Sequence, residues 1–556
     1  MGKAKIEAVC VRILLTTVAT VTLVVTPYLS TDPINLPKLL LLVIGAFGMM
    51  ALVFTNYRKF DFKVYRTSGS VLLLFVLDLF LVLLNTPGNK FEQFFGITGR
   101  NTGTLAYLSL SIIMFTSILV SNQRFLHLFS YQAIFIGSTL VIYGWLQSTG
   151  KEFFPYISSY ANPVIGTFGN PDFQSAFVGI IGVLGFGLSL PKSKVFSKQL
   201  ALVFVPIASI YIIVLTGARQ GFLCFVAGSG LVLILFSFSR GWRKISFFLS
   251  IIGSIGGLLV FFGLINRGPL ADLLFKNSLA ARGYYWRAAF QMLKEHPMTG
   301  IGLDGFGDSY RGARSLEAAL FNPGLASDAA HNVYLDFASS GGIPLVMLYL
   351  FIVALVIKSI VRVALRGTRT ELPFIAISGA WFAYQVQAFV SINQLGLAIW
   401  GWILSGIIIG YEINTRSTSG IPKESISRKP KQMTAKPVVL IPLFCGSIIG
   451  GLLAAPPFLA SIRYYEALKS SDVRIIDFAA KAWPPDRFRL LQSASIFEAN
   501  KFGPQAKILT VKATEQFPDC FEAWRLLSQL SSATPAQIVQ AKSEMKRLDP
   551  YNPDLK

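Results

Sequence analysis

The stretch DAAHNVYLDFASSGGIPLVMLYLF, residues 328–351, joins a long polar segment to an apolar run that is long enough to enter a membrane. His331 and Asn332 lie at this boundary, and His331 is one of only three histidines in the chain. A titratable side chain at a membrane boundary, beside flexible small residues, is a candidate for proton-transfer chemistry. The alternative is a loop histidine that only caps the next helix.

The composition excludes a mostly soluble protein. Of the 556 residues 53% are hydrophobic and only 14% are charged, and the mean hydropathy is +0.57. Most of the chain is therefore expected in lipid. The four cysteines are scattered, with no CxxC pair and no zinc spacing. We expect neither a disulfide framework nor a metal site, and no cofactor.

The apolar runs predict an all-α membrane bundle. A bilayer core needs about 20 apolar residues of helix, and by that length we expect about 12–13 spans. They fall near 9–29, 36–54, 68–85, 104–121, 126–147, 173–190, 200–216, 221–238, 245–265, 336–357, 372–391, 395–412 and 438–460. The first run follows basic residues and has no obvious cleavage site, so we interpret it as an uncleaved first helix.

The distribution of Lys and Arg predicts the orientation. With the N-terminus in the cytoplasm, the short cytoplasmic loops hold most of the cations. They carry Arg58, Lys59, Lys63, Arg66, Arg124, Lys192, Lys194, Lys198, Arg240, Arg243, Lys244, Lys358, Arg362, Arg366, Arg369, Arg416, Lys423, Arg428, Lys429, Lys431 and Lys436. The short outer loops hold little beyond Lys90, Arg100, Lys151 and Arg219. This asymmetry accounts for most of the net charge of +22, so no nucleic-acid partner is needed.

The predicted topology divides the chain into five parts. Residues 1–265 form an N-terminal membrane bundle, 266–335 an extracytoplasmic loop, 336–437 further membrane helices with a cytoplasmic linker, 438–460 the last span, and 461–556 an extracytoplasmic tail. We expect a multi-pass protein of the cytoplasmic (inner) membrane.

The tail, residues 461–556, changes in character because it is charged and helix-forming. Pro485, Pro518 and Pro553 each precede an aspartate, at intervals of 33 and 35 residues. A period near 34 with helix–turn–helix content resembles tetratricopeptide repeats. A plain helical tail is the alternative, and either form offers a surface for a protein partner.

Arg219 lies in LTGARQGFL (215–223), between two apolar runs. A cation at the centre of the hydrocarbon costs about 2.5–3.5 kcal/mol, and less near an interface. Such a residue is retained more readily beside an anion, for which a phosphate is the natural choice on the outer face. The alternative is an interfacial arginine that reaches lipid head groups.

The outer segment contains a group of aromatic residues flanked by cations. Arg282 and Arg287 flank Tyr284, Tyr285 and Trp286 at the start of an amphipathic helix. Aromatic rings near cations suit a membrane-surface helix that meets sugar and phosphate groups. An interfacial helix with ordinary anchoring aromatics is the alternative.

Four glycines follow this helix with the spacing GxGxxG, namely Gly300, Gly302, Gly305 and Gly307. No βαβ pattern surrounds them, so a dinucleotide site is not supported. We expect a loop in which the glycines let the backbone turn back towards the membrane.

These pieces together resemble the O-antigen ligase and O-antigen polymerase superfamily, over roughly residues 160–410. The resemblance is carried by GTFGNPDFQSA (166–176), Arg219 with Leu223, the segment from Arg282 to Gly307, and His331-Asn332. The chain departs from the family pattern near Gly342. Leu345 stands where the family has glycine, threonine or tyrosine, and Ser340-Gly341 replaces a frequent acidic residue.

The resemblance implies a membrane glycosyltransferase. It would move a glycan from a polyprenyl-pyrophosphate carrier to a lipid, glycan or protein acceptor on the outer face, without a metal. Arg219 and Arg282 would stabilise the leaving pyrophosphate, and His331 would take or orient the acceptor proton. Substrate-binding residues would be Asn170, Trp286, Arg287 and Asn332.

Alternatives remain at two levels. Asp304, Asp308 and Asp328 are other candidate bases, ranked lower because a carboxylate of ordinary pKa is a weak base. A transporter or flippase for the lipid-linked glycan would need polar residues across the bundle, where Asp78 is the main one. A membrane scaffold that acts through its tail is the other functional alternative.

Overall fold

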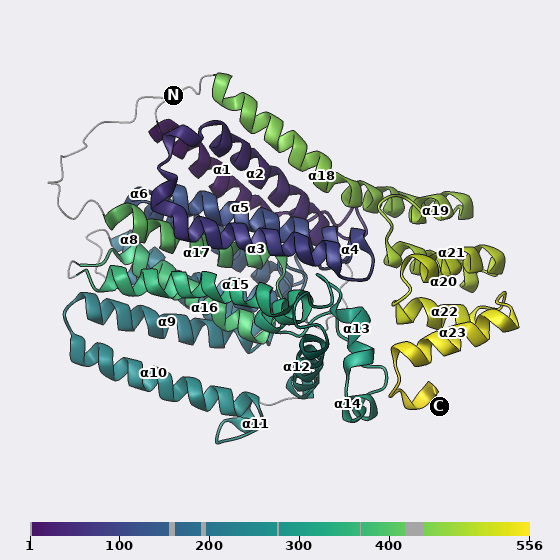
Figure 1. Ribbon diagram of the computed structural model, residues 1–556. Coiled ribbons are helices and arrows are strands. Elements are labelled where there is room, and N and C mark those ends of the chain that lie inside the picture. The colour runs from purple at the N-terminus through teal and green to yellow at the C-terminus, as the bar shows by residue number, and fades with distance from the viewer. Residues whose placement is uncertain are drawn as a thin grey trace.

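The fold is that of a computed structural model, which describes residues 3–154, 162–190, 196–274, 277–366, 369–416 and 437–555 (Figure 1). These residues form helices and loops, without strands, as the sequence predicted. Residues 191–195 and 417–436, which contain many of the predicted cytoplasmic cations, lie outside this described part.

Each of the thirteen predicted spans coincides with one helix of the bundle. These are α1 (Lys3–Leu23), α2 (Asn35–Thr55), α3 (Arg66–Asn85), α5 (Thr104–Val120), α6 (Gln123–Ser148), α7 (Pro171–Ser189), α8 (Phe196–Thr216), α9 (Gln220–Ser239), α10 (Arg243–Leu264), α15 (Val333–Ala364), α16 (Leu372–Val390), α17 (Leu395–Thr415) and α18 (Pro437–Ser470). Within the described ranges, ten helices are long and apolar enough to cross a membrane. α5 and α8 are apolar over shorter lengths, and α16 is not among the ten.

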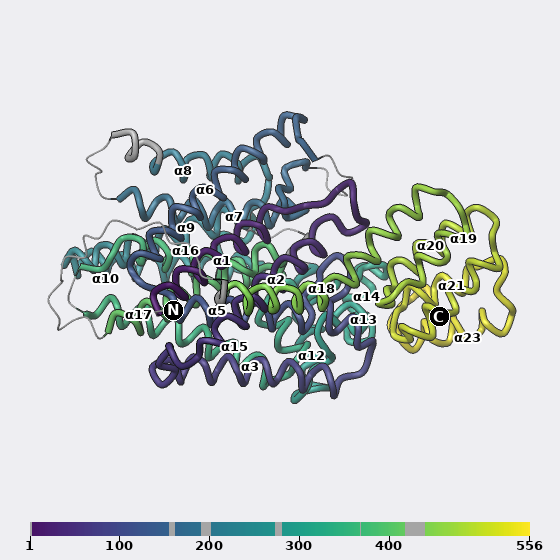
Figure 2. Tube along the Cα trace, turned by 90° about the horizontal axis from the view of Figure 1, so that it is seen from above, coloured from purple at the N-terminus to yellow at the C-terminus, as the bar shows by residue number. Residues whose placement is uncertain are grey.

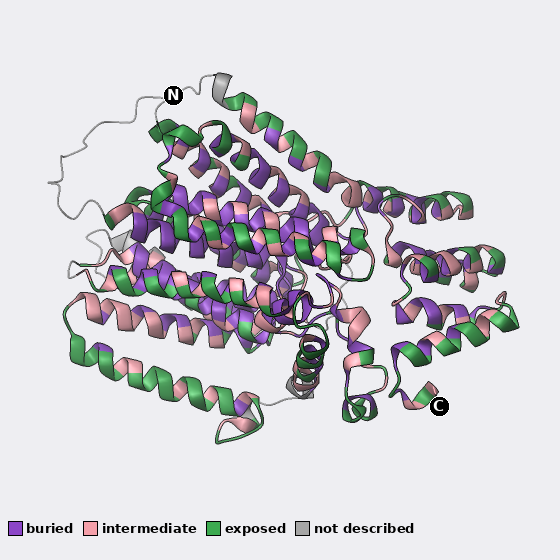
Figure 3. Ribbon diagram, viewed as in Figure 1, coloured by how far each residue is buried: buried purple, intermediate pink, exposed green. Residues whose placement is uncertain are grey.

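α17 is the central helix of the bundle, and every residue from Leu395 to Ile413 is buried. α10 lies at the opposite extreme, with most of its surface exposed (Figure 3). α5 approaches α17 closely because α17 carries small residues on the facing side. A Cβ atom at Gly406 would lie 2.5 Å from the backbone oxygen of Met114. Small residues at such positions let membrane helices pack backbone against backbone.

The segment 266–335 and the tail lie at the same end of the bundle, as Figures 1 and 2 show from two directions. The N-terminus lies at the other end. We call the end of the bundle at which the segment 266–335 and the tail lie the tail-side end. Its short helices are α4 (Lys90–Phe95), α11 (Ala271–Leu274), α12 (Asn277–Glu295), α13 (Phe306–Ala313) and α14 (Leu316–Phe321). The arrangement places the predicted outer segments together, while their side of the membrane stays a prediction.

α15 is not the single continuous span expected at 336–357. Gly342 breaks it with φ 70° and ψ −167°, a conformation that favours glycine. The glycine loop after α12 hydrogen-bonds with the backbone around this break. Ile343 N donates to Pro297 O (2.8 Å), and Ile301 N donates to Ser339 O (2.9 Å). The loop after α12 therefore holds the backbone of α15 on both sides of the break.

The tail is helical, with its own apolar core. It consists of α19 (Val473–Ala480), α20 (Arg487–Ala499), α21 (Gly503–Gln516), α22 (Phe521–Gln529), α23 (Pro535–Leu548) and the short η4 (Pro553–Leu555). α18 continues past the predicted boundary at 460, and Tyr464 near its end is buried in the core of the tail. Its hydroxyl lies 2.9 Å from Ser493 Oγ. The assignment of the helices to tetratricopeptide repeats stays a prediction.

Candidate functional site

A cavity of about 600 Å³ opens at the tail-side end of the bundle. Connections between helices form most of its wall: residues 31–35, 98–100, 168–170, 172–173, 326–329, 331 and 391–394, together with Tyr285 of α12 and Phe488 of α20. Polar groups gather there because each connection carries the free backbone and capping groups of a helix end. His331 and Asn170 are the predicted site residues that line it.

His331 lies in the cavity wall with a left-handed backbone, φ 54°. Its imidazole stacks on the ring of Tyr285, with centroids 5.6 Å apart and planes 25° apart. Burial, and after it the charges of Arg282 and Arg100, together lower the pKa of His331 to about 3. The imidazole is therefore neutral at pH 7, with a nitrogen lone pair free to accept a proton.

Arg282 is the predicted cation that the structure places beside His331. Its Nη1 donates to the backbone oxygen of Val390 (2.8 Å), and its Nη2 lies 3.8 Å from Asp172 Oδ2. Burial lowers the pKa of Arg282, and Asp172 opposes that effect. α12, the end of α16 and the start of α7 thus converge on one guanidinium, which fixes its position.

Arg100 is a second cation near His331 and, unlike Arg282, lines the cavity, whereas the sequence indicated only a loop residue. Its Nη1 donates to Asp328 O, and its Nη2 lies 3.8 Å from Asp304 Oδ1. Burial disfavours its charge, but the neighbouring carboxylates, Asp304 first, hold the pKa of Arg100 above its usual value. Its side chain is only 11% exposed. A buried, restrained cation next to the neutral His331 is suited to an anionic ligand.

A polar network in the cavity wall holds the loop that carries Arg100. Asp32 accepts hydrogen bonds from the backbone NH groups of Asn35 (2.9 Å) and Gly99 (3.2 Å). Asn35 in turn donates to Gly99 O (2.6 Å) and accepts from Gln394 Nε2 (3.0 Å). Burial raises the pKa of Asp32, which these backbone donors oppose. No single sequence motif predicts this network, because its members come from three separate connections between helices.

The three alternative bases have different surroundings. The carboxylate of Asp304 already accepts three hydrogen bonds, from Ile97 N (3.1 Å), Thr102 N (3.2 Å) and Thr102 Oγ1 (2.6 Å). Asp308 pairs with Arg487 of the tail. Asp328 alone of the three lines the cavity of His331.

Arg219 lies outside the cavity wall. It occupies the exposed N-cap of α9, in the turn between α8 and α9. Ser175, one turn into α7, fixes this turn by donating to Ala218 O (3.2 Å) and accepting from Gly221 N (3.0 Å). The structure therefore does not bring Arg219 to His331, but it places Arg219 next to the helix whose start borders the cavity.

Both predicted asparagines cap helices. Asn170 lines the cavity and caps α7 by accepting from Asp172 N (2.7 Å). Asn332 caps α15, where its Oδ1 accepts from Tyr334 N (3.0 Å) and Leu335 N (3.1 Å). The side chain of Asn332 is buried and is not part of the cavity wall. The cap that the sequence allowed for His331 is thus provided by its neighbour.

Trp286 and Arg287 are not part of the cavity wall. Trp286 packs edge-on against Phe389 at 5.8 Å. Arg287 pairs with Glu317 (2.8 Å) in an exposed position and lies 4.7 Å from the ring of Tyr284. Both stabilise the position of α12, against α16 and α14 respectively, rather than contribute to the wall of this cavity.

The site thus combines a neutral imidazole with two restrained guanidinium groups. The described residues contain no group of three or more side chains suited to hold a metal ion. Fixed cations of this kind stabilise a phosphate or a developing oxyanion, and the imidazole can accept a proton from a hydroxyl.

In the comparison with protein families a model matches part of the chain, and the comparison with curated proteins finds no match. The family model described as O-antigen ligase matches residues 203–350. This segment contains Arg219, Arg282 and His331, whereas Arg100 and Asn170 lie before it. The match is narrower than the resemblance at residues 160–410. Residues 203–350 are thus similar to the O-antigen ligase family, which supports the resemblance of the chain to the O-antigen ligase superfamily.

Proposed function

We propose that the protein transfers a glycan from a polyprenyl-pyrophosphate carrier to a hydroxyl-bearing acceptor at the tail-side end, which faces the outside of the cytoplasmic membrane. The observation that carries this proposal is that His331 and Arg100 line one cavity and that Arg282 lies close enough to act electrostatically on His331. About 600 Å³ lies within the range of about 300–1,000 Å³ that is usual for small-molecule sites.

The two arginines act on the leaving group. As the bond from the sugar C1 to the diphosphate oxygen breaks, negative charge develops on the diphosphate. Arg282 and Arg100 are fixed by their carboxylate and carbonyl partners, so they stabilise that charge without reorganising. The released polyprenyl diphosphate keeps the electron pair of the broken bond.

His331 acts on the acceptor. The acceptor oxygen forms the new bond to C1, and its proton moves to the imidazole of His331 and from there to water. Burial and the two arginines make the imidazole a weak base. A bound diphosphate offsets the arginine charges, so we expect the pKa of His331 to rise when the donor is bound. Proton acceptance is then coupled to donor binding.

Arg219 acts at the approach to the site. The lipid part of the donor stays in the bilayer, so the diphosphate arrives from the bundle. Arg219 is exposed in the turn that Ser175 of α7 holds, and we infer that this turn borders that path. We infer that it binds the diphosphate on entry, which would lower the KM for the donor rather than raise kcat.

The test measures transfer of a lipid-linked glycan by variants that are present in the membrane at equal levels. Arg100→Gln and Arg282→Gln should lower kcat, and Arg219→Gln should raise the donor KM. Arg525→Gln, an exposed arginine of α22, is the matched control. An unchanged kcat in both Arg100→Gln and Arg282→Gln would contradict the proposed role of these cations in the transfer.

A further inference from the structure

We propose that the tail is a fixed wall of the transfer cavity, and that Phe488 binds the acceptor sugar. The second part rests on the proposed glycan transfer, whereas the first part rests on geometry alone. Phe488, in the first turn of α20, is the tail residue that lines the cavity of His331. Its side chain is 43% exposed, so a large part of the ring is available to a ligand.

The residue before Phe488 anchors α20 to two other parts of the chain. Arg487 Nε donates to Glu92 Oε1 of α4 (2.8 Å), and its Nη2 donates to Asp308 Oδ2 of α13 (2.8 Å). The side chain of Arg487 is 15% exposed, and both carboxylates hold its pKa well above the usual value although burial opposes its charge. One arginine thereby fixes the start of α20 against the bundle and the outer segment.

The residue before Arg487 connects α20 with the loop that carries Arg100. Asp486 caps α20 by accepting from Arg489 N (3.0 Å), and it also accepts a hydrogen bond from Thr98 Oγ1. Thr98 and Arg100 both line the cavity. Three consecutive residues, Asp486 to Phe488, therefore contact the bundle, the outer segment and the cavity.

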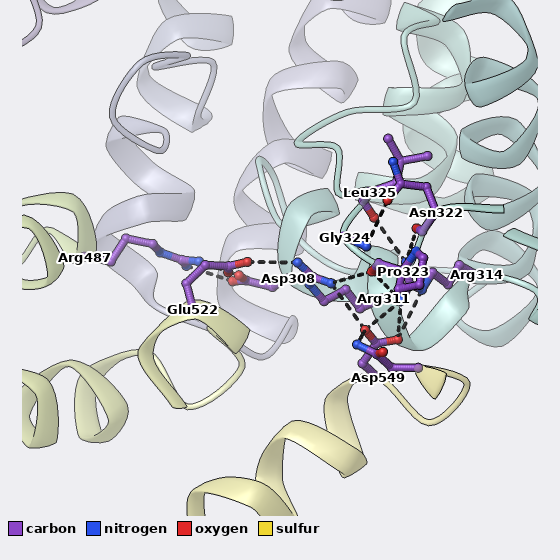
Figure 4. A network of polar contacts seen from close by, with 11 residues as sticks. Asp308, Arg311, Arg314, Asn322, Pro323, Gly324, Leu325, Arg487, Glu522 and Asp549 are labelled. Carbon is purple, nitrogen blue, oxygen red and sulfur yellow. Dashed lines mark hydrogen bonds and ion pairs between the residues drawn. The ribbon is translucent and has the colours of Figure 1, made fainter. Parts of the chain in front are cut away.

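A second anchor lies at the far end of the tail (Figure 4). Asp549 pairs with Arg314 (Nη2–Oδ2 2.7 Å), and both side chains are fully buried. Arg311 bonds Asp549 (3.3 Å) and Glu522 of α22 (3.1 Å). Arg314 also donates to Leu325 O (3.2 Å), next to the cavity wall at 326–329.

These anchors argue for a permanent wall. Buried ion pairs add little net stability, but they fix relative positions strongly, because separating them leaves unpaired charges. Two such anchors at opposite ends of the tail leave it no freedom to swing as a recruitment arm. The scaffold alternative, which treats the tail as a separate module, does not account for a tail residue in the wall beside His331.

The position of Phe488 indicates which ligand it contacts. The donor enters from the bundle, because its lipid stays in the bilayer, and the two arginines hold its diphosphate. The tail lies beyond the end of the membrane helices (Figure 1). A half-exposed ring there offers a flat apolar surface, which suits the apolar face of an acceptor sugar. We expect Phe488 to affect the acceptor and not the donor.

Two measurements test the two parts separately. In Arg487→Met, hydrogen exchange at residues 90–95 of α4 and 306–313 of α13 should become faster than in the wild type, since these two helices lose their ion pairs to the tail. Unchanged exchange would overturn the fixed wall, whatever the enzymatic activity. Residues 245–260 of the exposed α10 provide the internal control, and their exchange should not change.

The kinetic measurement uses Phe488→Ala with the lipid-linked donor and a defined glycan acceptor. The acceptor KM should rise roughly three- to tenfold, the size of a lost aromatic contact, and Phe488→Trp should restore it. Phe478→Ala, an exposed phenylalanine of α19, is the matched control.

An unchanged acceptor KM, or an equal change in the donor KM, would overturn the role of Phe488. Loss of transfer in Phe488→Ala with normal hydrogen exchange would likewise count against a role confined to the acceptor. If His331→Gly kept full activity while Phe488→Ala raised the acceptor KM, the base assignment would fail and the acceptor site would stand.

Discussion

The imidazole of His331 stacks on the ring of Tyr285, 5.6 Å between centroids, although the two residues come from different elements of the outer segment. The left-handed backbone of His331 and this stacking together set the direction of the imidazole. Tyr285 belongs to the same helix as Arg282. The orientation of the base and the position of the cation therefore depend on one helix, α12.

The first prediction concerns this stacking. Tyr285→Ala should lower kcat about three- to tenfold, because the imidazole loses a contact of about 0.5–1.5 kcal/mol that orients it. Tyr285→Phe keeps the ring and should retain activity near that of the wild type. Steady-state kinetics with the lipid-linked donor provide the measurement. Equal losses in both variants would instead assign the effect to the hydroxyl.

The second prediction concerns pH. The pKa of His331 in the free protein is about 3, below the ordinary 6.5, because of burial and then the charges of Arg282 and Arg100. His331 stays neutral as the pH falls through 6.5, so kcat/KM should not decline there. In Arg100→Gln one of these charges is gone, and the acid limb should move upward towards 6.5. The pH profiles of both proteins, with the same donor, provide the comparison. An acid limb at the same pH in both would contradict the electrostatic coupling.

The third prediction concerns the buried pair of Arg314 and Asp549. Asp549→Asn leaves a buried guanidinium without its charge partner and should cost about 3–5 kcal/mol of the free energy of unfolding. Asp519→Asn is the matched control. It breaks the exposed pair with Arg547 in the same tail, which should cost about 0–1 kcal/mol. Thermal or denaturant unfolding of the tail checks both values. Equal costs would show that the burial of Asp549 does not matter.

The fourth prediction concerns the break in α15. Gly342→Ala places a Cβ 2.5 Å from Pro297 O at φ +70°, so the glycine loop must shift. We expect less folded protein and lower transfer activity, at a cost of at least about 1–2 kcal/mol. Gly253→Ala in α10, where a Cβ meets open space, is the control and should behave as the wild type. Normal yield and activity in Gly342→Ala would show that the loop adapts without loss.

The sequence predicts the helices well and the cavity only in part. Apolar length and the bias of Lys and Arg are local signals, so the thirteen helices and the gathering of the outer segments at one end follow from them. Arg282 and His331 could be brought together by the family resemblance. Arg100 could not, because its contact with Asp328 joins residues 228 positions apart through the tertiary fold.

The tail shows the same limit. Its helices are predictable from composition, but its role in the cavity wall depends on Arg487 reaching Glu92, 395 residues away. Arg219 illustrates the converse. Its place between two apolar runs predicts that Arg219 lies at the tail-side end of the bundle. The same pattern does not predict that its turn lies outside the cavity. Side chains that act together across such distances are revealed only by the packing of the helices.

The most direct measurement replaces His331 by glycine, which accepts the left-handed backbone without strain and leaves space for a small molecule. Transfer of the lipid-linked glycan should fall about 10²–10⁴-fold, and added imidazole should restore part of it. His127→Gly, at an exposed position of α6, is the control for histidine loss and should not respond to imidazole. Full transfer by His331→Gly without imidazole would contradict the account.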